Sequence, residues 1–250
     1  MIKIAIIGGS GLGDPGIVKD PEKITVDTPY GNPSSELLTG KINGVSIVNL
    51  SRHSKGHTIP PSQVNNRANI CALQKLGCTH IITTTACGSL REEIGRGDLV
   101  IPDQFIDFTR HRKVTFHEVF EPDKMKHTPM ADPFSEELRN ALIESAIELK
   151  LKFHTRGTVI TIEGPRFSTR AESNMFRIIG ADLVNMSIAP EVILANEASI
   201  PYATVAMSTD FDCWKTDEKP VFWEDVLEVF NKNVKNVINL ILKTLPKIKE

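Results

Sequence analysis

Short apolar runs alternate with longer stretches of helical periodicity along most of the chain. The runs that read as buried strands are Lys3–Ile7, Val45–Ser51, His80–Thr85, Thr158–Ile162, Leu183–Met186 and Tyr202–Met207. Helices are expected over Ser62–Leu76, Ser135–Leu149, Thr169–Ile179 and Glu224–Leu245. This alternation predicts an α/β fold with helices on both faces of a sheet, formed as a single domain over residues 1–250.

The helix limits carry recognisable signals, and one long segment carries none. Thr169 and Glu172 have the spacing of a capping box, and Gly77 and Gly180 follow two of the expected helices. The stretch Pro102–Pro133 has little periodicity and several charges. A loop of that length in a compact domain is usually functional or ordered by a partner subunit.

Composition excludes some classes of binding partner. The chain has 250 residues, 40% apolar content and a formal net charge of −2, so it lacks the broad basic surface that nucleic acid requires. Its four cysteines have no metal-ligand spacing, and no window is apolar enough for a membrane span. The N-terminal sequence lacks the pattern of a signal peptide. We therefore expect a cytoplasmic protein with small-molecule ligands and no nucleic-acid or membrane partner.

Two carboxylates, Asp210 and Asp212, follow the last expected strand. Ligands of open α/β sheets bind at the carboxyl ends of strands. If the segment stays extended, both side chains lie on one face, where proximity and burial raise one pKa. Such a pair could read a purine edge with one acid and one acceptor. The alternative is that the two aspartates start a turn or cap a helix.

The first two expected strands also end in candidate chemistry. Gly8-Gly9-Ser10-Gly11 offers backbone N–H groups and a hydroxyl to an anion, with a plain tight turn as the alternative. A dinucleotide fingerprint fails there because position 14 is Asp14 rather than glycine. Arg52 and His53, followed by His57, form a compact anion clamp, or else a solvated arginine with surface histidines.

Three further strand ends add hydroxyls and an aromatic ring. Thr85 lies at the lip of its strand, whereas Cys87 is expected to be a buried, inert thiol. Phe167 follows another strand and could stack on a flat base, although aromatic residues at such turns are more often core. Met186 and Ser187 could offer a backbone donor and a hydroxyl. Together these groups at several strand ends favour one ligand site over independent turns.

Longer motifs carry a family resemblance over residues 2 to about 214. They are IIGGSGL, DTPYG, RHSKGHTIPPSQVNNRANI, TTACGSLREE, GDLVIPDQFID, HTPMADPF, VTIEGPRFSTRAES and STDFDCW, in family order. With these motifs the chain resembles the S-methyl-5′-thioadenosine phosphorylases of the trimeric purine nucleoside phosphorylase superfamily. The resemblance implies a central mixed, twisted sheet and cleavage of the bond between purine N9 and sugar C1′ by inorganic phosphate.

The resemblance also implies roles for particular residues. Phosphate binding falls to Ser10, Arg52, His53, Thr85, Ala86 and Ser187. Substrate binding falls to Phe167, Met186, Asp210, Asp212, His127, Trp223, Val226 and Leu227, with Asp210 as the catalytic acid at N7 and Asp212 accepting from the N6 amine. His127 resembles a residue that reaches a neighbouring subunit's 5′ pocket. The implied assembly is a homotrimer, or trimers paired into hexamers.

No metal and no organic cofactor is expected, because phosphate is the co-substrate and nucleophile. For Asp210 to act as an acid it must be protonated, which we attribute to partial burial and the neighbouring charge of Asp212. A carboxylate facing position 6 should favour 6-aminopurines over 6-oxopurines. Trp223 replaces a small aliphatic residue of the animal members, so we expect an altered 5′ pocket that leaves adenosine as a second substrate; the alternative is a surface anchor for the last helix.

Other classes of function are weighed against this one. A nucleosidase of the same fold would use water instead of phosphate, and the phosphate-binding set argues against it. A non-catalytic nucleoside sensor is disfavoured by the intact Asp210 pair. A dinucleotide-dependent oxidoreductase lacks its glycine fingerprint.

Overall fold

The computed structural model describes residues 2–8, 18–219 and 221–249. Its strands are β1 (Lys3–Gly8), β2 (Lys19–Ile24), β3 (Leu37–Ile42), β4 (Val45–Ser51), β5 (His80–Ser89), β6 (Leu99–Val100), β7 (Gln104–Phe108), β8 (Phe153–His154), β9 (Thr158–Ile162), β10 (Leu183–Asn185) and β11 (Tyr202–Asp210). Its α-helices are α1 (Asn66–Lys75), α2 (Glu136–Glu148), α3 (Arg170–Ile178), α4 (Ile188–Glu197) and α5 (Trp223–Thr244).

The described strands form one mixed sheet with a parallel centre. Its main path runs β2-β3-β4-β1-β5-β10-β9-β7, and β11 pairs with β5 and with β6 off this path. Strands β4, β1, β5 and β11 run parallel to one another, whereas β3 runs antiparallel to β4 and β10 runs antiparallel to β5. Every residue of β11 is buried, because a central parallel strand is covered on both faces.

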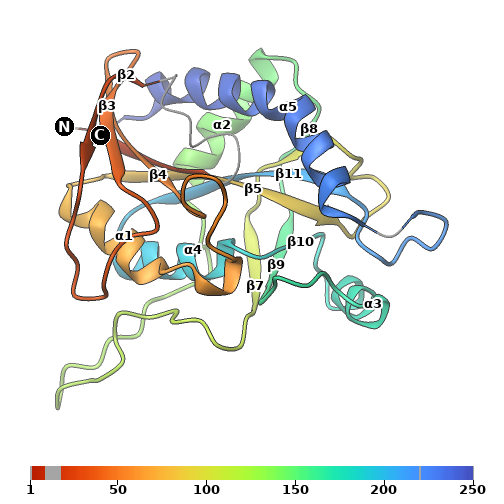
Figure 1. The fold of residues 1–250 in the computed structure, drawn as a ribbon, viewed down its shortest axis with the longest axis horizontal. Helices are drawn as coiled ribbons and strands as arrows, with labels where there is room; N and C mark the ends of the chain where they lie inside the picture. The colour runs from red at the N-terminus through yellow and green to blue at the C-terminus, as the bar shows by residue number, and fades with distance from the viewer. Residues whose placement is uncertain (1, 9–17, 220, 250) are drawn as a thin grey trace.

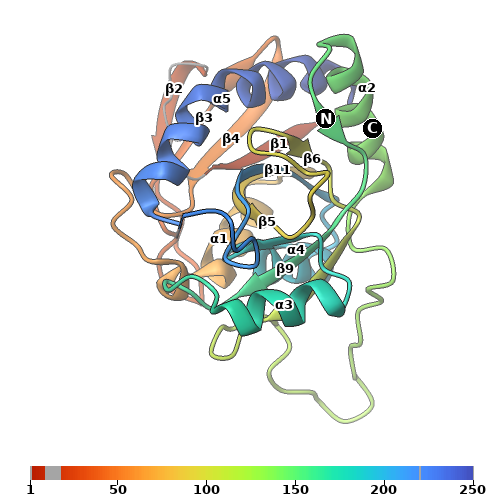
Figure 2. The same cartoon turned by 90° about the vertical axis from the view of Figure 1, so that its right-hand side faces the viewer.

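Helices cover both faces of the sheet, as the alternating pattern predicts. Figures 1 and 2 show α2 and α5 on one side and α1 and α4 on the other. Alternate residues of β1 point to opposite faces of the sheet and belong to two separate hydrophobic cores. Ile4 and Ile6 pack with residues of α2 and α5. Ala5 and Ile7 pack with residues of α1 and α4. Helix α3 packs with a third cluster around Phe176.

The six strands and four helices expected from the sequence are all present, with three differences of boundary larger than one residue. Strand β5 continues to Ser89, four residues beyond its expected end. The first helix begins at Asn66 rather than Ser62, because the Asn65 side chain accepts a hydrogen bond from the backbone of Ala68 and caps it there. Strand β11 continues to Asp210, three residues beyond the expected end. The capping box of Thr169 and Glu172 is confirmed.

Some elements have no clear sequence signal. Helix α4 is apolar on all sides and has Pro190 in its first turn, so it shows no amphipathic period. Strand β7 occupies part of the stretch expected to be irregular, which therefore starts at residue 109. Among the described residues, no helix has both the length and the apolar character that a membrane span needs.

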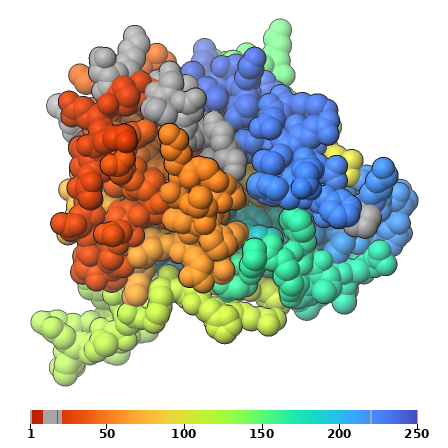
Figure 3. Space-filling view, in the orientation of Figure 1, coloured from red at the N-terminus to blue at the C-terminus, as the bar shows by residue number. Residues whose placement is uncertain are grey.

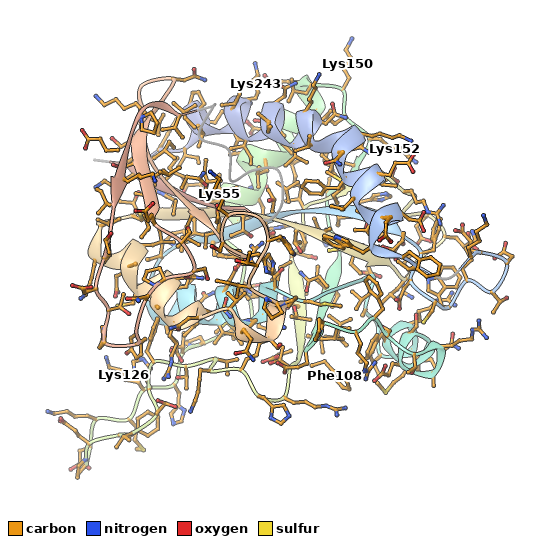
Figure 4. All side chains as sticks on the ribbon, viewed as in Figure 1. Lys55, Phe108, Lys126, Lys150, Lys152 and Lys243 are labelled. Atoms are coloured by element: carbon orange, nitrogen blue, oxygen red, sulfur yellow. The ribbon has the colours of Figure 1, made fainter. Side chains whose placement is uncertain are left out.

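Residues 109–133 form a long loop that projects from the body of the molecule. In Figures 1 and 3 the loop extends away at the lower left, and Figure 4 places Lys126 on the opposite side of the molecule from Lys243 of α5. The base of the loop is fixed, since the Glu197 carboxylate accepts bonds of 2.7 Å from the Thr115 hydroxyl and from the Phe116 backbone N–H. The projecting part carries the exposed side chains Val119, Phe120 and Met125.

Candidate active site

One pocket opens where the central strands end. It is lined by the C-terminal parts of β5, β10 and β11, by the segments that follow β4, β9, β10 and β11, and by the first turns of α5. In Figure 3 the surface is hollowed between the orange segment after β4 and the blue start of α5. Of the residues expected in the site, it brings together Arg52, His53, Thr85, Ala86, Phe167, Met186, Ser187, Asp210, Asp212, Trp223, Val226 and Leu227.

Arg52 enters the pocket as half of a buried ion pair. Its Nε and Nη2 donate to the two carboxylate oxygens of Glu191 at 2.5 and 2.9 Å, and Nη1 donates to the Thr84 carbonyl at 2.9 Å. Arg52 is only 2% exposed and Glu191 is fully buried. A guanidinium has five N–H donors, so two remain for a ligand in the pocket. The solvated-arginine alternative is therefore wrong.

His53 is a neutral imidazole with a fixed orientation. Its Nδ1 lies 2.8 Å from the Ile59 carbonyl, which makes Nδ1 the protonated nitrogen and leaves Nε2 as an acceptor. Burial lowers the pKa of His53 to about 4, and the neighbouring Arg52 charge adds to the effect. At neutral pH this side chain can therefore accept a hydrogen bond from a ligand hydroxyl.

Two hydroxyls from different strands meet beside this arginine. Thr85 Oγ1 lies 3.1 Å from Ser187 Oγ, and the Asn185 amide donates to Thr85 Oγ1 at 3.2 Å. Thr85 is near the end of β5 and Ser187 follows β10, so the topology joins residues 102 positions apart. With Arg52 these hydroxyls form a compact set of donors suited to an oxyanion. Cys87 also lines the pocket, but burial raises the pKa of its thiol, as expected for an inert cysteine.

Asp210 and Asp212 lie together at another part of the same pocket. Asp210 is 7% exposed; its Oδ2 accepts from the Thr209 hydroxyl at 2.9 Å and its Oδ1 from the Asp212 backbone N–H at 2.8 Å. Burial raises the pKa of Asp210, and the two hydrogen bonds only partly oppose it. Asp210 is thus arranged to hold a proton at a higher pH than an exposed aspartate.

Asp212 offers an open acceptor to the pocket. Its Oδ2 is buried without a hydrogen-bond partner among the described residues, and the same holds for the hydroxyls of Ser168 and Ser173. Burial raises the pKa of Asp212, the nearby serines act against it, and the Asp210 charge adds to it. Because Asp212 lines the pocket, this oxygen can accept from a ligand donor in addition to its interaction with the serine hydroxyls.

The route by which the two carboxylates meet differs from the expected one. The segment does not stay extended: β11 ends at Asp210 with an irregular register, and Asp212 has a left-handed φ of 49°. The alternative in which the two aspartates start a turn is thus correct, since the Asp210 carboxylate accepts the hydrogen bond from the Asp212 backbone N–H at the start of that turn. The leading cause of the raised Asp210 pKa is burial, and the hydrogen bond from the Asp212 backbone N–H lowers it.

The remaining wall of the pocket is apolar and aromatic. Val226 and Leu227 line it from α5, and Trp223 is 43% exposed at its edge. The Trp223 ring centroid lies 5.3 Å from that of His57, which in turn lies 4.3 Å from that of His53. This stack joins the segment after β4 to the start of α5.

Two of the expected residues are not placed in this pocket. Ser10 lies outside the described residues. His127 is exposed on the projecting loop, with its ring 5.6 Å from Phe120, and does not line the pocket of its own chain.

Sequence reasoning missed two charged residues that support the site. Glu191 interrupts the apolar sequence of α4, and an isolated acid in such a helix indicates a buried partner. Arg112, from the start of the loop, donates to the carbonyls of Met186 and Glu163 at 2.6 Å each. Its run of basic residues resembles an ordinary solvated loop, so no sequence signal distinguishes it.

Comparison with known proteins agrees with this geometry. Residues 3–246 match the model of the phosphorylase superfamily, and the chain belongs to that superfamily. It is 53% identical over 251 residues to the S-methyl-5′-thioadenosine phosphorylase of Aedes aegypti, with 100% of this chain and 90% of the relative covered. The corresponding protein of Hyperthermus butylicus is 47% identical, with 98% and 88% covered. Within the superfamily, the chain is a member of the S-methyl-5′-thioadenosine phosphorylase family.

Solved structures give the same result. Methylthioadenosine phosphorylase from Schistosoma mansoni in complex with adenine superposes with a TM-score of 0.92 at 45% identity, covering 98% of this chain and 91% of that one. A variant of adenosine/methylthioadenosine phosphorylase from the same organism, in complex with methylthioadenosine, has a TM-score of 0.91 at 44% identity, with the same coverage.

The absence of a side chain at Gly88 makes room for the carboxylates. A Cβ there would lie 2.9 Å from Asp210 Oδ1 and 3.2 Å from Asp212 Cβ. We expect Gly88→Ala to displace Asp210 and lower the kcat of phosphorolysis by roughly tenfold to a hundredfold, because small misplacements of a catalytic group are costly. Gly95→Ala is the matched control, since its Cβ would have no neighbour nearer than 3.5 Å. Equal kcat values for the two variants would refute this role of Gly88.

Proposed function

We propose that this protein cleaves S-methyl-5′-thioadenosine with inorganic phosphate, releasing adenine and 5-methylthioribose 1-phosphate. The observation that carries the proposal is that a single pocket has two parts with different chemistry. One part has two buried carboxylates with raised pKa values, and another has a guanidinium, a neutral imidazole and paired hydroxyls.

In the proposed complex adenine lies between Phe167 and the two aspartates. The unpartnered Oδ2 of Asp212 accepts from the exocyclic N6 amine, and protonated Asp210 donates to N7. Met186 contributes to the ribose site through its backbone N–H, because its carbonyl already accepts from Arg112.

Phosphate occupies the other part of the pocket, with Ser10 and the backbone of Ala86 as further donors. The two remaining N–H groups of Arg52 and the hydroxyls of Thr85 and Ser187 donate to its oxygens. Neutral His53 accepts from a phosphate hydroxyl through Nε2. Phosphate is a substrate in this scheme, and the reaction needs no organic cofactor or metal.

The reaction is favoured because both parts of the pocket bind the transition state more strongly than the substrate. A phosphate oxygen forms the new bond to C1′ as the C1′–N9 bond breaks and its electron pair moves into the purine. Positive charge develops on the sugar next to phosphate, and negative charge develops on the base next to the Asp210 proton. Transfer of that proton to N7 completes the departure of adenine.

The aromatic wall supports adenosine as a second substrate. The 5′ substituent meets Trp223, Val226 and Leu227, which suit a methylthio group. His57, in contact with Trp223, supplies a polar group at the same wall that can bond to a 5′ hydroxyl. A structural relative carries both substrates in its name, as an adenosine/methylthioadenosine phosphorylase.

We also propose that the active form is a homotrimer, in which the projecting loop completes the 5′ site of a neighbour. The exposed side chains of Val119 and Met125 are 87% and 69% accessible in the single chain, which is unfavourable unless they are covered. Whether trimers pair further into hexamers is a separate property of the assembly. All four cysteines are free, which fits a cytoplasmic location.

The substrate assignment is tested by adenine release from methylthioadenosine, adenosine and methylthioinosine, each with and without phosphate. We expect turnover only with phosphate, because a phosphate oxygen is the nucleophile in this scheme and the scheme gives no group of the described pocket the role of activating water. Methylthioinosine should be a poor substrate by at least about a hundredfold, since its 6-oxo group faces the Asp212 carboxylate. Phosphate-independent turnover would instead identify a nucleosidase, and comparable turnover of methylthioinosine would refute the role of Asp212.

The contribution of a neighbouring chain is tested with His127→Ala, with Lys126→Ala as the adjacent control. We expect the trimer to persist by light scattering and the KM for methylthioadenosine to rise roughly fivefold, as for loss of one hydrogen bond, with the KM for phosphate unchanged. Co-assembly of His127→Ala chains with Asp210→Asn chains should restore some low-KM sites, because an intact Asp210 site that neighbours an Asp210→Asn chain receives that chain's His127. A monomer of full activity, or no restoration in the mixture, would contradict this assembly.

A further inference from the structure

We propose that the stack of Trp214 on Arg177 is the device that positions Asp212 for base recognition. Trp214 touches neither base nor phosphate in the proposed complex, so it would be a positioning residue. The inference rests on the proposed function, since it concerns how that same site discriminates between purines.

Trp214 joins two elements that the base site depends on. The Arg177 guanidinium of α3 lies 3.8 Å from the centre of the indole ring, and the indole N–H donates to the Ser89 carbonyl at the end of β5 at 2.8 Å. Arg177 is itself fixed, because its Nε donates to the Leu90 carbonyl at 3.1 Å. The ring is thereby held between the helix that follows Phe167 and the strand end that contains Gly88.

Further contacts hold the rest of the segment that contains Asp212. Lys215 forms an ion pair of 2.8 Å with Glu92, and Arg96 forms one with Glu218. On the α3 side, the Cys213 thiol donates to the Ser168 carbonyl at 3.2 Å. Each of the two ion pairs has one exposed partner and is worth little, so we assign the main restraint to the half-buried Trp214 stack.

Asp212 needs such external support because its own environment opposes its conformation. It has a left-handed φ of 49°, a buried carboxylate, and an Oδ2 without a partner. The left-handed region is costly for a non-glycine residue, although aspartate tolerates it better than most, so contacts from the surrounding structure add to the local hydrogen bond from the Asp212 N–H to Asp210. The stack lies two residues away and supplies that restraint.

The phosphate-binding groups do not depend on this restraint. Arg52, Thr85 and Ser187 are held by Glu191, by Asn185 and by one another, and none of these groups contacts Trp214. Weakening the stack should therefore reduce discrimination between bases and leave phosphate binding intact. A general loss of structure would reduce both.

The test compares Arg177→Gln, Trp214→Ala and Trp214→Phe with Arg110→Gln. Arg110 is the matched control, because its guanidinium lies over Phe108 at 6.0 Å and Phe108 packs on the same apolar cluster as Trp214. For each protein we would measure KM for phosphate, kcat/KM for methylthioadenosine and methylthioinosine, and the affinities for adenine and hypoxanthine.

We expect Arg177→Gln and Trp214→Ala to reduce the preference for 6-aminopurines by about tenfold, with the KM for phosphate within about twofold of wild type. Trp214→Phe, which keeps a ring under the guanidinium, should recover part of the preference, and Arg110→Gln should match wild type. An unchanged adenine-to-hypoxanthine affinity ratio in Arg177→Gln would overturn the inference, as would a parallel loss of phosphate binding. The affinities for adenine and hypoxanthine are measured without turnover. They therefore test the role of Trp214 even if the wild-type protein fails to catalyse the proposed reaction.

Discussion

The buried ion pair between Arg52 and Glu191 is the interaction on which the rest of the site depends. It joins the end of β4 to α4, and Tyr202 of β11 donates to the same Glu191 carboxylate at 3.0 Å. Removing one partner of such a pair typically costs about 3–5 kcal/mol, because the other charge is left buried and unpaired. The pair therefore fixes the relative positions of three elements that end at the pocket.

This pair also sets the electrostatics of the pocket. Glu191 balances the Arg52 charge, so an anion in the pocket would meet directed donors rather than a large excess of positive charge. Burial, with the Arg52 charge adding to it, lowers the pKa of His53 and keeps it neutral, and burial is also the leading cause of the raised Asp210 pKa. Opposite chemical requirements, a donor set for an anion and a carboxylate that keeps its proton, thus coexist in one pocket because different elements supply them.

Much of this arrangement can be predicted from the sequence because strand ends gather at one edge of a sheet. The strand before Asp210 and the capped helix after Phe167 are both recognisable from local patterns. Helix α4 is not, since its uniform apolar character has no period, and its Glu191 could be assigned a partner only in three dimensions. The support that Arg112 gives to Met186 spans 74 residues and depends on tertiary contacts alone.

The conformation of the carboxylate pair shows the same limit. Sequence spacing correctly brings Asp210 and Asp212 to one pocket, but the path is a turn with a left-handed residue rather than an extended strand. The local sequence is compatible with both conformations, and the contacts of Trp214 with α3 and β5 that accompany the turn are tertiary.

The central claim is that Asp210 protonates the departing base. Its most direct test is the pH dependence of kcat for wild type and Asp210→Asn, with phosphate saturating. Because the protonated form is active and burial raises its pKa, wild-type kcat should fall as the pH rises through that pKa. Asp210→Asn should lack this dependence and be slower by roughly a hundredfold or more, with phosphate affinity little changed. A variant with wild-type kcat, or with the same pH-dependent decline, would contradict the account.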